Sequence, residues 1–286
     1  MRLQQRYLPV DLAFSGLRVR NIDPPVFTAE RFFAPEECAE LIALAQESGM
    51  LQASGVGAGH AGAAYATNSR RTSSSMLADP LTLAANPRLR ALCGALQSRA
   101  WRLLCAGEGK GWGPQGRLPA PGQLCYESLQ IARYEAGQHF LPHEDGFPAE
   151  LVEQNGFQRR ATLLVYLNDA AAGGATRFEQ LGFAVQPRAG TALLFFPAFA
   201  DGSPDARTLH QGEDAQDTKW IAQQWVACGA AAPVPSGNGA AAAAPGAGPA
   251  FEELVAARAR RRPADKRNKK KGSGQGSDKQ RGFGGR

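Results

Sequence analysis

The stretch from Tyr126 to Val226 is a succession of short β-rich runs separated by turn residues. The runs are SLQIARY, ATLLVYLN, ATRFE, FAVQP, TALLFFPAF and KWIAQQWV. Many short strands at regular spacing are typical of a β-sandwich or a β-barrel. The pattern therefore predicts a mainly β domain, and on periodicity alone it leaves both architectures open.

Two segments ahead of this region have the pattern of amphipathic helices. In residues 34–48, APEECAELIALAQES, acidic residues come early and apolar residues follow at helical spacing, so we expect a helix that begins near Pro35. In residues 86–104, apolar side chains recur at three- and four-residue steps, which predicts a second helix. Residues 53–64 and 106–122 are predicted to be loops.

Length and composition indicate one folded unit. A chain of 286 residues that is 43% hydrophobic can bury a full core, with appendages around it. We expect a soluble protein, because no run of 18 apolar residues occurs and the opening MRLQQRYLPV lacks the apolar core of a secretory signal. The five cysteines are scattered and form no CxxC pair, which argues against a zinc cluster or a dense disulfide framework but leaves one or two bridges open.

Charge is divided unevenly along the chain. Residues 256–286 carry 12 Lys/Arg and two Asp, a net charge of +10, which leaves −4 for the rest. The Ala/Gly/Pro-rich segment before this tail cannot bury a core. We therefore divide the chain into an N-terminal extension (1–26), a folded domain (27–228), a disordered linker (229–250) and a basic disordered tail (251–286).

The tail has two interpretations. Residues 258–271, RARRRPADKRNKKK, resemble a two-part nuclear-targeting signal, and the glycine–arginine end is of a style common in RNA-associated tails. These features favour contact with nucleic acid or another polyanion. A solvated tail without an address function is the alternative.

Three residues have the types and spacing of a metal site. His143 and Asp145 lie two apart in HFLPHEDGFP, so in an extended strand both side chains point to one face. His210 lies 67 residues downstream, just before a β-rich run. Two histidines and one carboxylate are the facial ligand set of non-haem Fe(II) oxygenases. Because HxD pairs also arise by chance, the triad alone does not decide the function.

Lys219 adds an independent signal. In a strand it shares a face with Ile221, Gln223 and Trp225, and a lysine on an inward face needs an anionic partner because an unpaired buried charge is costly. A dicarboxylate cosubstrate would supply that partner. The alternative is a lysine at the exposed end of a strand.

The motifs RTSSSML, LQIARYEAGQHFLPHEDGF, RRATLLVYLND, GGATRF, GTALLFFP and RTLHQG followed by KW occur in one order. Over residues 27–226 this series resembles the catalytic domain of the prolyl 4-hydroxylases, both the collagen type and its plant and algal relatives. The resemblance implies a double-stranded β-helix (jelly-roll) core with flanking helices. It also implies that the folded domain, residues 27–228, is an Fe(II)- and 2-oxoglutarate-dependent dioxygenase domain.

Residue roles follow from the same resemblance. Its iron ligands would be His143, Asp145 and His210, and Lys219 would pair with the distal carboxylate of 2-oxoglutarate. Tyr134 and Thr176 match positions that help to hold that carboxylate. A lysine rather than an arginine at position 219 is similar to the collagen and plant branch. The order of the motif assigns no metal role to His139, which we expect to be structural.

The implied reaction is hydroxylation of peptidyl proline at C4, with decarboxylation of 2-oxoglutarate to succinate and CO2 and with ascorbate and O2 as further requirements. The partner would be a proline-rich polypeptide in an extended polyproline II form. Five residues match positions that line the peptide groove: Arg71, Ser73, Glu127, Arg159 and Trp225. The alternatives are a core aromatic for Trp225 and surface salt bridges for Arg71 and Glu127.

Several points stay open at this stage. Phe140 and Ala227 stand where relatives often have Tyr and His, which puts the peptide preference in doubt. The same chemistry on a ribosomal or cytosolic protein is one alternative function, and a non-catalytic RNA-associated jelly roll is another. The resemblance implies the endoplasmic reticulum, whereas the absence of a visible signal peptide favours the cytosol or nucleus or an incomplete N-terminus. The sequence does not define the oligomeric state.

Overall fold

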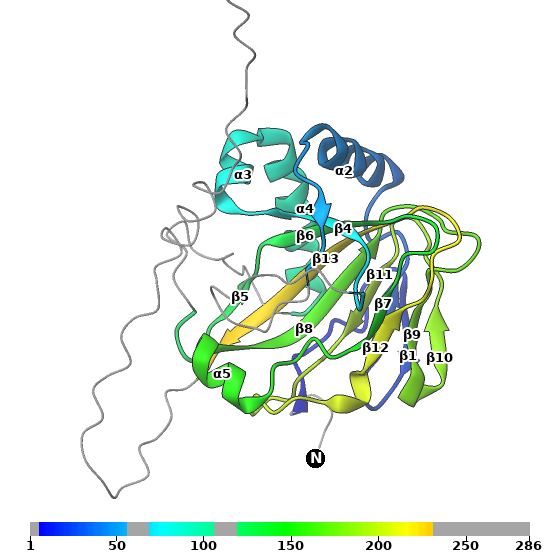
Figure 1. Cartoon of the computed structure of the whole chain (residues 1–286). Helices are drawn as coiled ribbons and strands as arrows, with labels where there is room; N and C mark the ends of the chain where they lie inside the picture. The colour runs from blue at the N-terminus through cyan, green and yellow to red at the C-terminus, as the bar shows by residue number, and fades with distance from the viewer. Residues whose placement is uncertain (1–5, 56–68, 106–118, 231–286) are drawn as a thin grey trace, which may run out of the picture.

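The structure, a computed structural model, describes residues 6–55, 69–105 and 119–230 (Figure 1). Most of the two predicted loops, and all of the predicted linker and tail beyond residue 230, lie outside these ranges. The fold class is confirmed: two β-sheets make a jelly-roll core, and helices flank one of them.

The described residues form a nine-stranded and a four-stranded sheet, with antiparallel pairing throughout (Figure 1). The main sheet runs in the order β1 (Leu17–Asn21), β2 (Val26–Ala29), β11 (Ala192–Phe195), β8 (Phe157–Tyr166), β13 (Lys219–Gly229), β6 (Leu129–Tyr134), β4 (Ser74–Ala78) and β3 (Gln52–Ala53), with β5 (Leu124–Tyr126) paired to β13. The smaller sheet runs in the order β10 (Phe183–Val185), β9 (Thr176–Phe178), β12 (His210–Gly212) and β7 (Phe140–His143).

The second half of strand β8, ATLLVY, is almost entirely apolar, because both faces of the strand are buried. Its side chains alternate between two cores: Leu163 and Val165 belong to the core under the helices, and Leu164 and Tyr166 to the core between the sheets. A strand covered on both faces has no solvent side, so the polar alternation of a surface strand disappears. The second core is the inner wall on which the candidate site is built.

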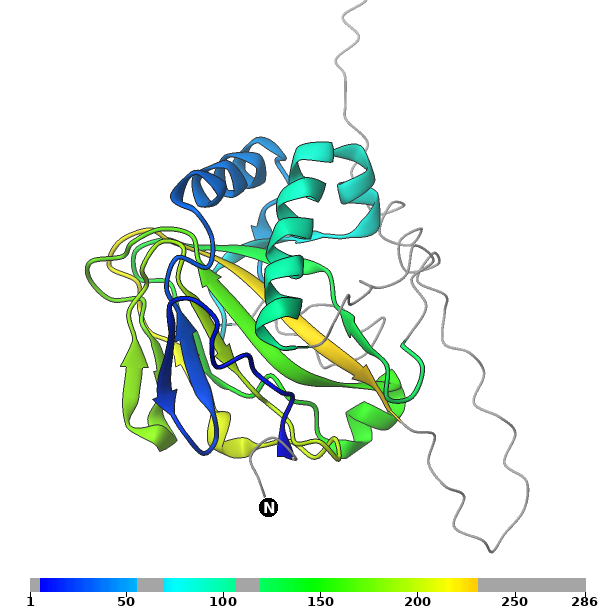
Figure 2. The same cartoon turned by 180° about the vertical axis from the view of Figure 1, so that it is seen from behind.

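Outside the sheets, the described residues include the α-helices α2 (Pro35–Glu47), α3 (Pro80–Ala85), α4 (Pro87–Leu103) and α5 (Ala149–Asn155). The two helices predicted from periodicity are α2 and α4. Proline in the first turn and a local cap define where α4 begins, since the Asn86 side chain accepts a hydrogen bond from the Leu89 amide at 3.0 Å. Figure 2 shows α4 across the back of the main sheet. Trp101 of α4 packs against Tyr126 of β5, with ring centres 4.2 Å apart and the rings tilted by 35°.

The N-terminal segment belongs to the domain, in contrast to the boundary drawn at residue 27. That boundary falls inside β2, and β2 pairs with both β1 and β11. Tyr7 lies in the larger core, and its hydroxyl donates a 2.8 Å hydrogen bond to Asp205. The sequence of β1 is short and polar and shows little periodicity. It forms a strand at the edge of the main sheet because it pairs with β2. At the other end, β13 extends through Gly229.

No helix in the described ranges combines sufficient length with sufficient apolar character to cross a bilayer.

Candidate active site

Three side chains converge at one end of the space between the sheets. His143 ends β7 and His210 begins β12, and the two residues are register partners in the smaller sheet. Asp145 lies in a bend two residues after His143, so it comes from a turn rather than from the extended strand that the spacing suggested. One ligand atom from each of the three residues lies within 4.8 Å of the others, which is close enough for one metal ion.

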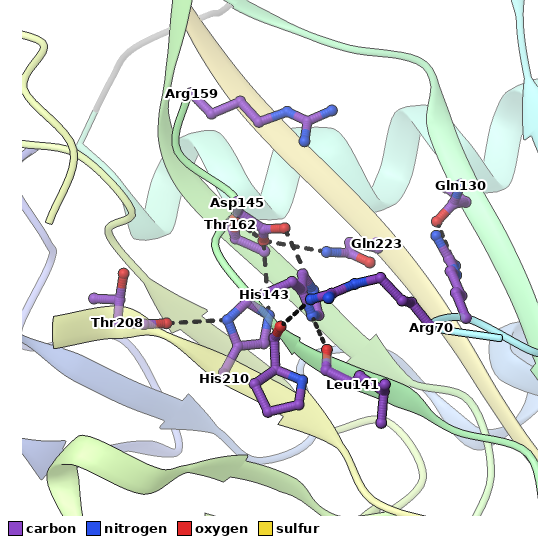
Figure 3. Close-up of polar contacts among 12 residues, drawn as sticks. Arg70, Gln130, Leu141, His143, Asp145, Arg159, Thr162, Thr208, His210 and Gln223 are labelled. Atoms are coloured by element: carbon purple, nitrogen blue, oxygen red, sulfur yellow. Dashed lines mark hydrogen bonds and ion pairs between the residues drawn. The ribbon is translucent and has the colours of Figure 1, made fainter. Parts of the chain in front are cut away.

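Both imidazole rings are oriented by backbone carbonyls (Figure 3). Leu141 O lies 2.9 Å from His143 Nδ1, and Thr208 O lies 3.0 Å from His210 Nδ1. A carbonyl only accepts, so each Nδ1 carries the hydrogen and each Nε2 keeps its lone pair for a metal. Burial, reinforced by the neighbouring His210, lowers the pKa of His143 to about 3, so this ring is neutral at physiological pH.

The Asp145 carboxylate is almost fully buried. Its Oδ1 lies 3.8 Å from His143 Nε2, and its Oδ2 lies 4.0 Å from His210 Nε2. Burial by itself favours the neutral acid, but the neighbouring histidines, the Arg159 guanidinium and the hydrogen bond from Thr162 together outweigh it and lower the pKa of Asp145. Glycine is required at the next position, because a Cβ on Gly146 would lie 2.5 Å from the Pro197 carbonyl oxygen. The site therefore presents an ionised carboxylate on a tightly packed turn.

Lys219 begins β13 and is only 2% exposed. Its ammonium group donates a 2.6 Å hydrogen bond to Gly174 O and lies 5.2 Å from the ring centre of Tyr134. No carboxylate of the described residues lies within ion-pair distance of it. Burial, partly offset by attraction to Glu213, lowers its pKa to about 8. A cation held in this way has a place for an anion from outside the protein.

Thr176 and Tyr166 lie beside the lysine. Tyr166 is fully buried, its ring centre is 5.8 Å from Lys219 Nζ, and its hydroxyl donates a 2.8 Å hydrogen bond to Thr176 Oγ1. The structure thus places Tyr134 beside Lys219 and connects Thr176 to the lysine through Tyr166. Sequence reasoning missed Tyr166, which lies on the face of β8 that lines the core between the sheets.

A second group, on the main sheet, contains three of the predicted peptide-groove residues. Arg159 makes a two-point ion pair with Glu127, with Nε–Oε1 at 2.7 Å and Nη2–Oε2 at 2.8 Å. The guanidinium also lies 3.8 Å from the ring centre of Trp225 and 4.8 Å from that of Phe147. This ion pair is largely buried, unlike a surface salt bridge. Trp225 Nε1 is buried and has no hydrogen-bond partner among the described residues.

A third group contains the other two predicted groove residues. Arg71 is 6% exposed, and it donates hydrogen bonds to Ser73 Oγ at 3.0 Å and to Gln130 Oε1 at 2.8 Å. Both acceptors are neutral, so Arg71 is not the surface salt bridge considered as its alternative. Its guanidinium lies 4.8 Å from the ring centre of Phe140, and that ring stacks on His143 at 3.5 Å. Arg71 is therefore connected to the metal-binding group through one aromatic ring.

His139 lies apart from this arrangement. Its Nδ1 is 2.9 Å from Asp214 Oδ1, and its Nε2 is 3.1 Å from Ser69 O. Both ring nitrogens are used in these contacts, and His139 is absent from the metal-binding group of the described residues. These two contacts tie His139 to the neighbouring Asp214 and Ser69.

The donor set fits Fe(II). Two neutral imidazoles with free Nε2 atoms and one ionised carboxylate are the ligand types of a facial triad that leaves further positions open. The buried cation on β13 fits an anionic cosubstrate. The arrangement can thus hold both components of an oxygenase reaction.

Comparison with known proteins supports this assignment. The profile of the 2OG-Fe(II) oxygenase superfamily matches residues 129–227, which include all three metal-binding residues and Lys219. This part of the chain is therefore similar to the 2OG-Fe(II) oxygenase superfamily. Members of that superfamily use Fe(II), 2-oxoglutarate and O2, and the residues of the candidate site fit those components.

Two curated proteins from Arabidopsis thaliana are similar to this chain. The chain is 37% identical to probable prolyl 4-hydroxylase 3 over 123 residues, or 36% of this chain and 43% of that protein. It is 29% identical to prolyl 4-hydroxylase 2 over 228 residues, or 71% of this chain and 67% of that protein. The chain therefore spans from less than half to about two thirds of the length of these relatives.

A solved structure shares the fold of this chain. It is the viral collagen prolyl hydroxylase from Paramecium Bursaria Chlorella virus-1, in a complex with 2OG, at a TM-score of 0.53 and 24% sequence identity. The match covers 71% of this chain and 96% of that one.

Proposed function

We propose that this oxygenase hydroxylates peptidyl proline at C4, using Fe(II), 2-oxoglutarate and O2, with ascorbate as the reductant that keeps the iron ferrous. The observation that carries the oxygenase part is Lys219, a buried cation whose missing anion a dicarboxylate cosubstrate would supply. The prolyl part is supported by the similarity to prolyl 4-hydroxylases over most of the described chain.

In this proposal His143, Asp145 and His210 hold the iron. Bound Fe(II) supplies the oxidation chemistry: one oxygen atom of O2 enters succinate, the other enters the new hydroxyl group, and 2-oxoglutarate loses CO2. The protein orients the imidazoles through Leu141 O and Thr208 O. No side chain has to act as a nucleophile.

Lys219 binds the distal carboxylate of 2-oxoglutarate. Among the described residues, its ammonium group donates one recorded hydrogen bond, to Gly174 O. An ammonium group has three N–H donors, so two are available for a carboxylate. The Tyr134 ring lies beside this ammonium group, and Thr176 is joined by a hydrogen bond to Tyr166, whose ring also lies beside it. Binding a dicarboxylate here would neutralise the buried charge and raise the pKa of Lys219.

The peptide groove runs past the two arginine groups. A polyproline II segment presents rings and outward-facing carbonyls, and proteins bind it with aromatic surfaces and polar donors. The Arg159–Trp225–Phe147 stack supplies aromatic surface, and the unpaired Trp225 Nε1 is a donor. Arg71, held by Ser73, supplies a second cationic edge.

The decisive experiment is mass spectrometry of proline-rich peptides incubated with Fe(II), 2-oxoglutarate and ascorbate. Wild-type protein is expected to add one oxygen atom at proline, and His143→Ala is expected to add none. His139→Ala is the matched control, because it removes a nearby histidine that lies outside the metal-binding group. Succinate formation with unmodified prolines would mean another protein target. Absence of both iron binding and succinate would overturn the enzyme assignment.

We further propose that the basic tail contacts a polyanion. Its support is the charge division, +10 over residues 256–286 against −4 for the rest of the chain. The test compares RNA binding by the full chain and by a chain that ends at residue 230, as a function of salt. Binding that is lost on truncation and weakened by salt is expected. Equal binding by both chains would refute this role.

A further inference from the structure

Two buried polar side chains converge on the carboxylate of the metal-binding group from neighbouring strands. Thr162 on β8 donates a 2.7 Å hydrogen bond to Asp145, and Gln223 on β13 donates one at 3.3 Å. Both bonds end on the same oxygen, Oδ2 (Figure 3). No hydrogen bond from the described residues ends on Oδ1.

The two oxygens of Asp145 therefore differ. A carboxylate oxygen accepts through two lone pairs, and the two donors occupy both of those on Oδ2. Each oxygen lies near one imidazole nitrogen, Oδ1 at 3.8 Å from His143 Nε2 and Oδ2 at 4.0 Å from His210 Nε2, but only Oδ1 keeps its lone pairs free of hydrogen bonds from the described residues. We infer that Thr162 and Gln223 are positioning residues that hold Asp145 as a one-oxygen ligand through Oδ1.

The chemistry requires this restriction. A facial triad leaves three positions open, two for the carboxylate and keto oxygens of 2-oxoglutarate and one for O2. A carboxylate that bound through both oxygens would fill one of them. Holding Oδ2 away from the metal by two hydrogen bonds keeps the full set of positions available. This inference rests on the proposed iron site.

The location of Thr162 supports a specific purpose for its hydroxyl. The residue is fully buried on the central strand β8, where it pairs with Phe195 on β11 and Trp225 on β13. At such an apolar strand position valine has the same shape without a polar group to satisfy. The recorded partner of the hydroxyl is Asp145 alone.

Gln223 has a comparable position. It is 4% exposed on the inward face of β13, the face that also carries Lys219 and Trp225. One face of β13 therefore carries Lys219, which would bind the cosubstrate, then Gln223 four residues later, which donates to the Asp145 carboxylate. Trp225, the proposed peptide contact, follows two residues after Gln223. The turn that carries Asp145 does not depend on these donors for its shape, because Gln158 holds it through both backbone groups of Phe147 at 2.8 Å.

The test measures Co(II) binding by calorimetry, with Co(II) standing in for Fe(II), in the full-length protein. Thr162→Val is expected to weaken binding about tenfold or more, as loss of an outer hydrogen bond to a ligand does, whereas Thr162→Ser, which keeps the hydroxyl, stays near wild type. Gln223→Met is expected to give a smaller loss, because its bond is longer. Thr28→Val, on a strand two places from β8 in the sheet, is the matched control with unchanged affinity.

The visible spectrum of the Co(II) protein gives a second readout, since it changes with the number of ligand atoms. Thr162→Val is expected to alter it, and Thr28→Val is not. Wild-type Co(II) affinity and spectrum in both Thr162→Val and Gln223→Met would overturn the inference while leaving the iron site intact. Failure of the wild-type protein to bind Co(II) would instead overturn the proposed function, and this inference with it. Metal-free circular dichroism identifies any variant that fails to fold.

Discussion

Replacing Lys219 by methionine should have two opposite effects on stability. Methionine has a similar length and no charge. Burial lowers the pKa of Lys219 from 10.5 to about 8, and at about 1.4 kcal/mol for each tenfold change in proton affinity the folded state loses about 3 kcal/mol by keeping this lysine charged. Without 2-oxoglutarate at pH 7, Lys219→Met should therefore be more stable than wild type, by up to ~3 kcal/mol.

The same change should reduce the response to the cosubstrate. Truncating one partner of a buried, hydrogen-bonded charge pair costs about 2–5 kcal/mol, so 2-oxoglutarate should bind at least about 30-fold more weakly. Wild type gains stability from bound ligand in proportion to the logarithm of its concentration above the dissociation constant. With Co(II) present throughout, the same concentration of added 2-oxoglutarate should thus stabilise wild type by about 2 kcal/mol more than it stabilises Lys219→Met.

The pH dependence checks the cause. Between pH 8 and 10.5 the unfolded chain binds a proton at Lys219 that the folded protein has lost, so wild-type stability rises relative to the variant across this window. The stability gap should be largest below pH 8 and should close above 10.5.

Urea unfolding with and without the cosubstrate, at several pH values, measures both effects. Arg90→Met, which removes a solvent-exposed cation from α4, is the control and should change stability by less than about 0.5 kcal/mol. The reasoning is refuted if Lys219→Met is no more stable than wild type without 2-oxoglutarate and responds equally to its addition.

Three further changes test other contacts. Tyr7→Phe removes a donor to the buried Asp205 carboxylate and should cost about 1–3 kcal/mol in urea unfolding; an unchanged midpoint would mean that the N-terminal segment is not part of the cooperative unit. Glu127→Gln loosens the Arg159 fork and should raise the KM for peptide while the KM for 2-oxoglutarate stays constant, and equal changes in both would contradict a groove role. Phe140→Leu removes the ring stacked on the first histidine ligand, and calorimetry should show weaker Co(II) binding without loss of fold.

Local features of the sequence account for much of the fold. Proline and a capping side chain specify where α4 begins, and helical spacing of apolar residues specifies the face it buries. The β-rich runs correspond to strands because each is short, β-branched or aromatic, and bounded by turn residues. Strand β1 and the small helix α5 were not predicted, because segments this short carry too little periodicity.

The candidate site divides along the same line. The sequence alone was enough to identify the three metal-binding residues, because their types and spacing are recognisable. It also identified Lys219, because the alternation of side chains along an apolar strand places this charge on the inward face. Only the tertiary structure decided that His210 pairs with His143 across two strands distant in sequence, and that Thr162 and Gln223 meet on one oxygen of Asp145. The physical reason is that the period of a strand assigns its side chains to a face, whereas the register between strands, set by the packing of the whole sheet, decides which side chains on that face become neighbours.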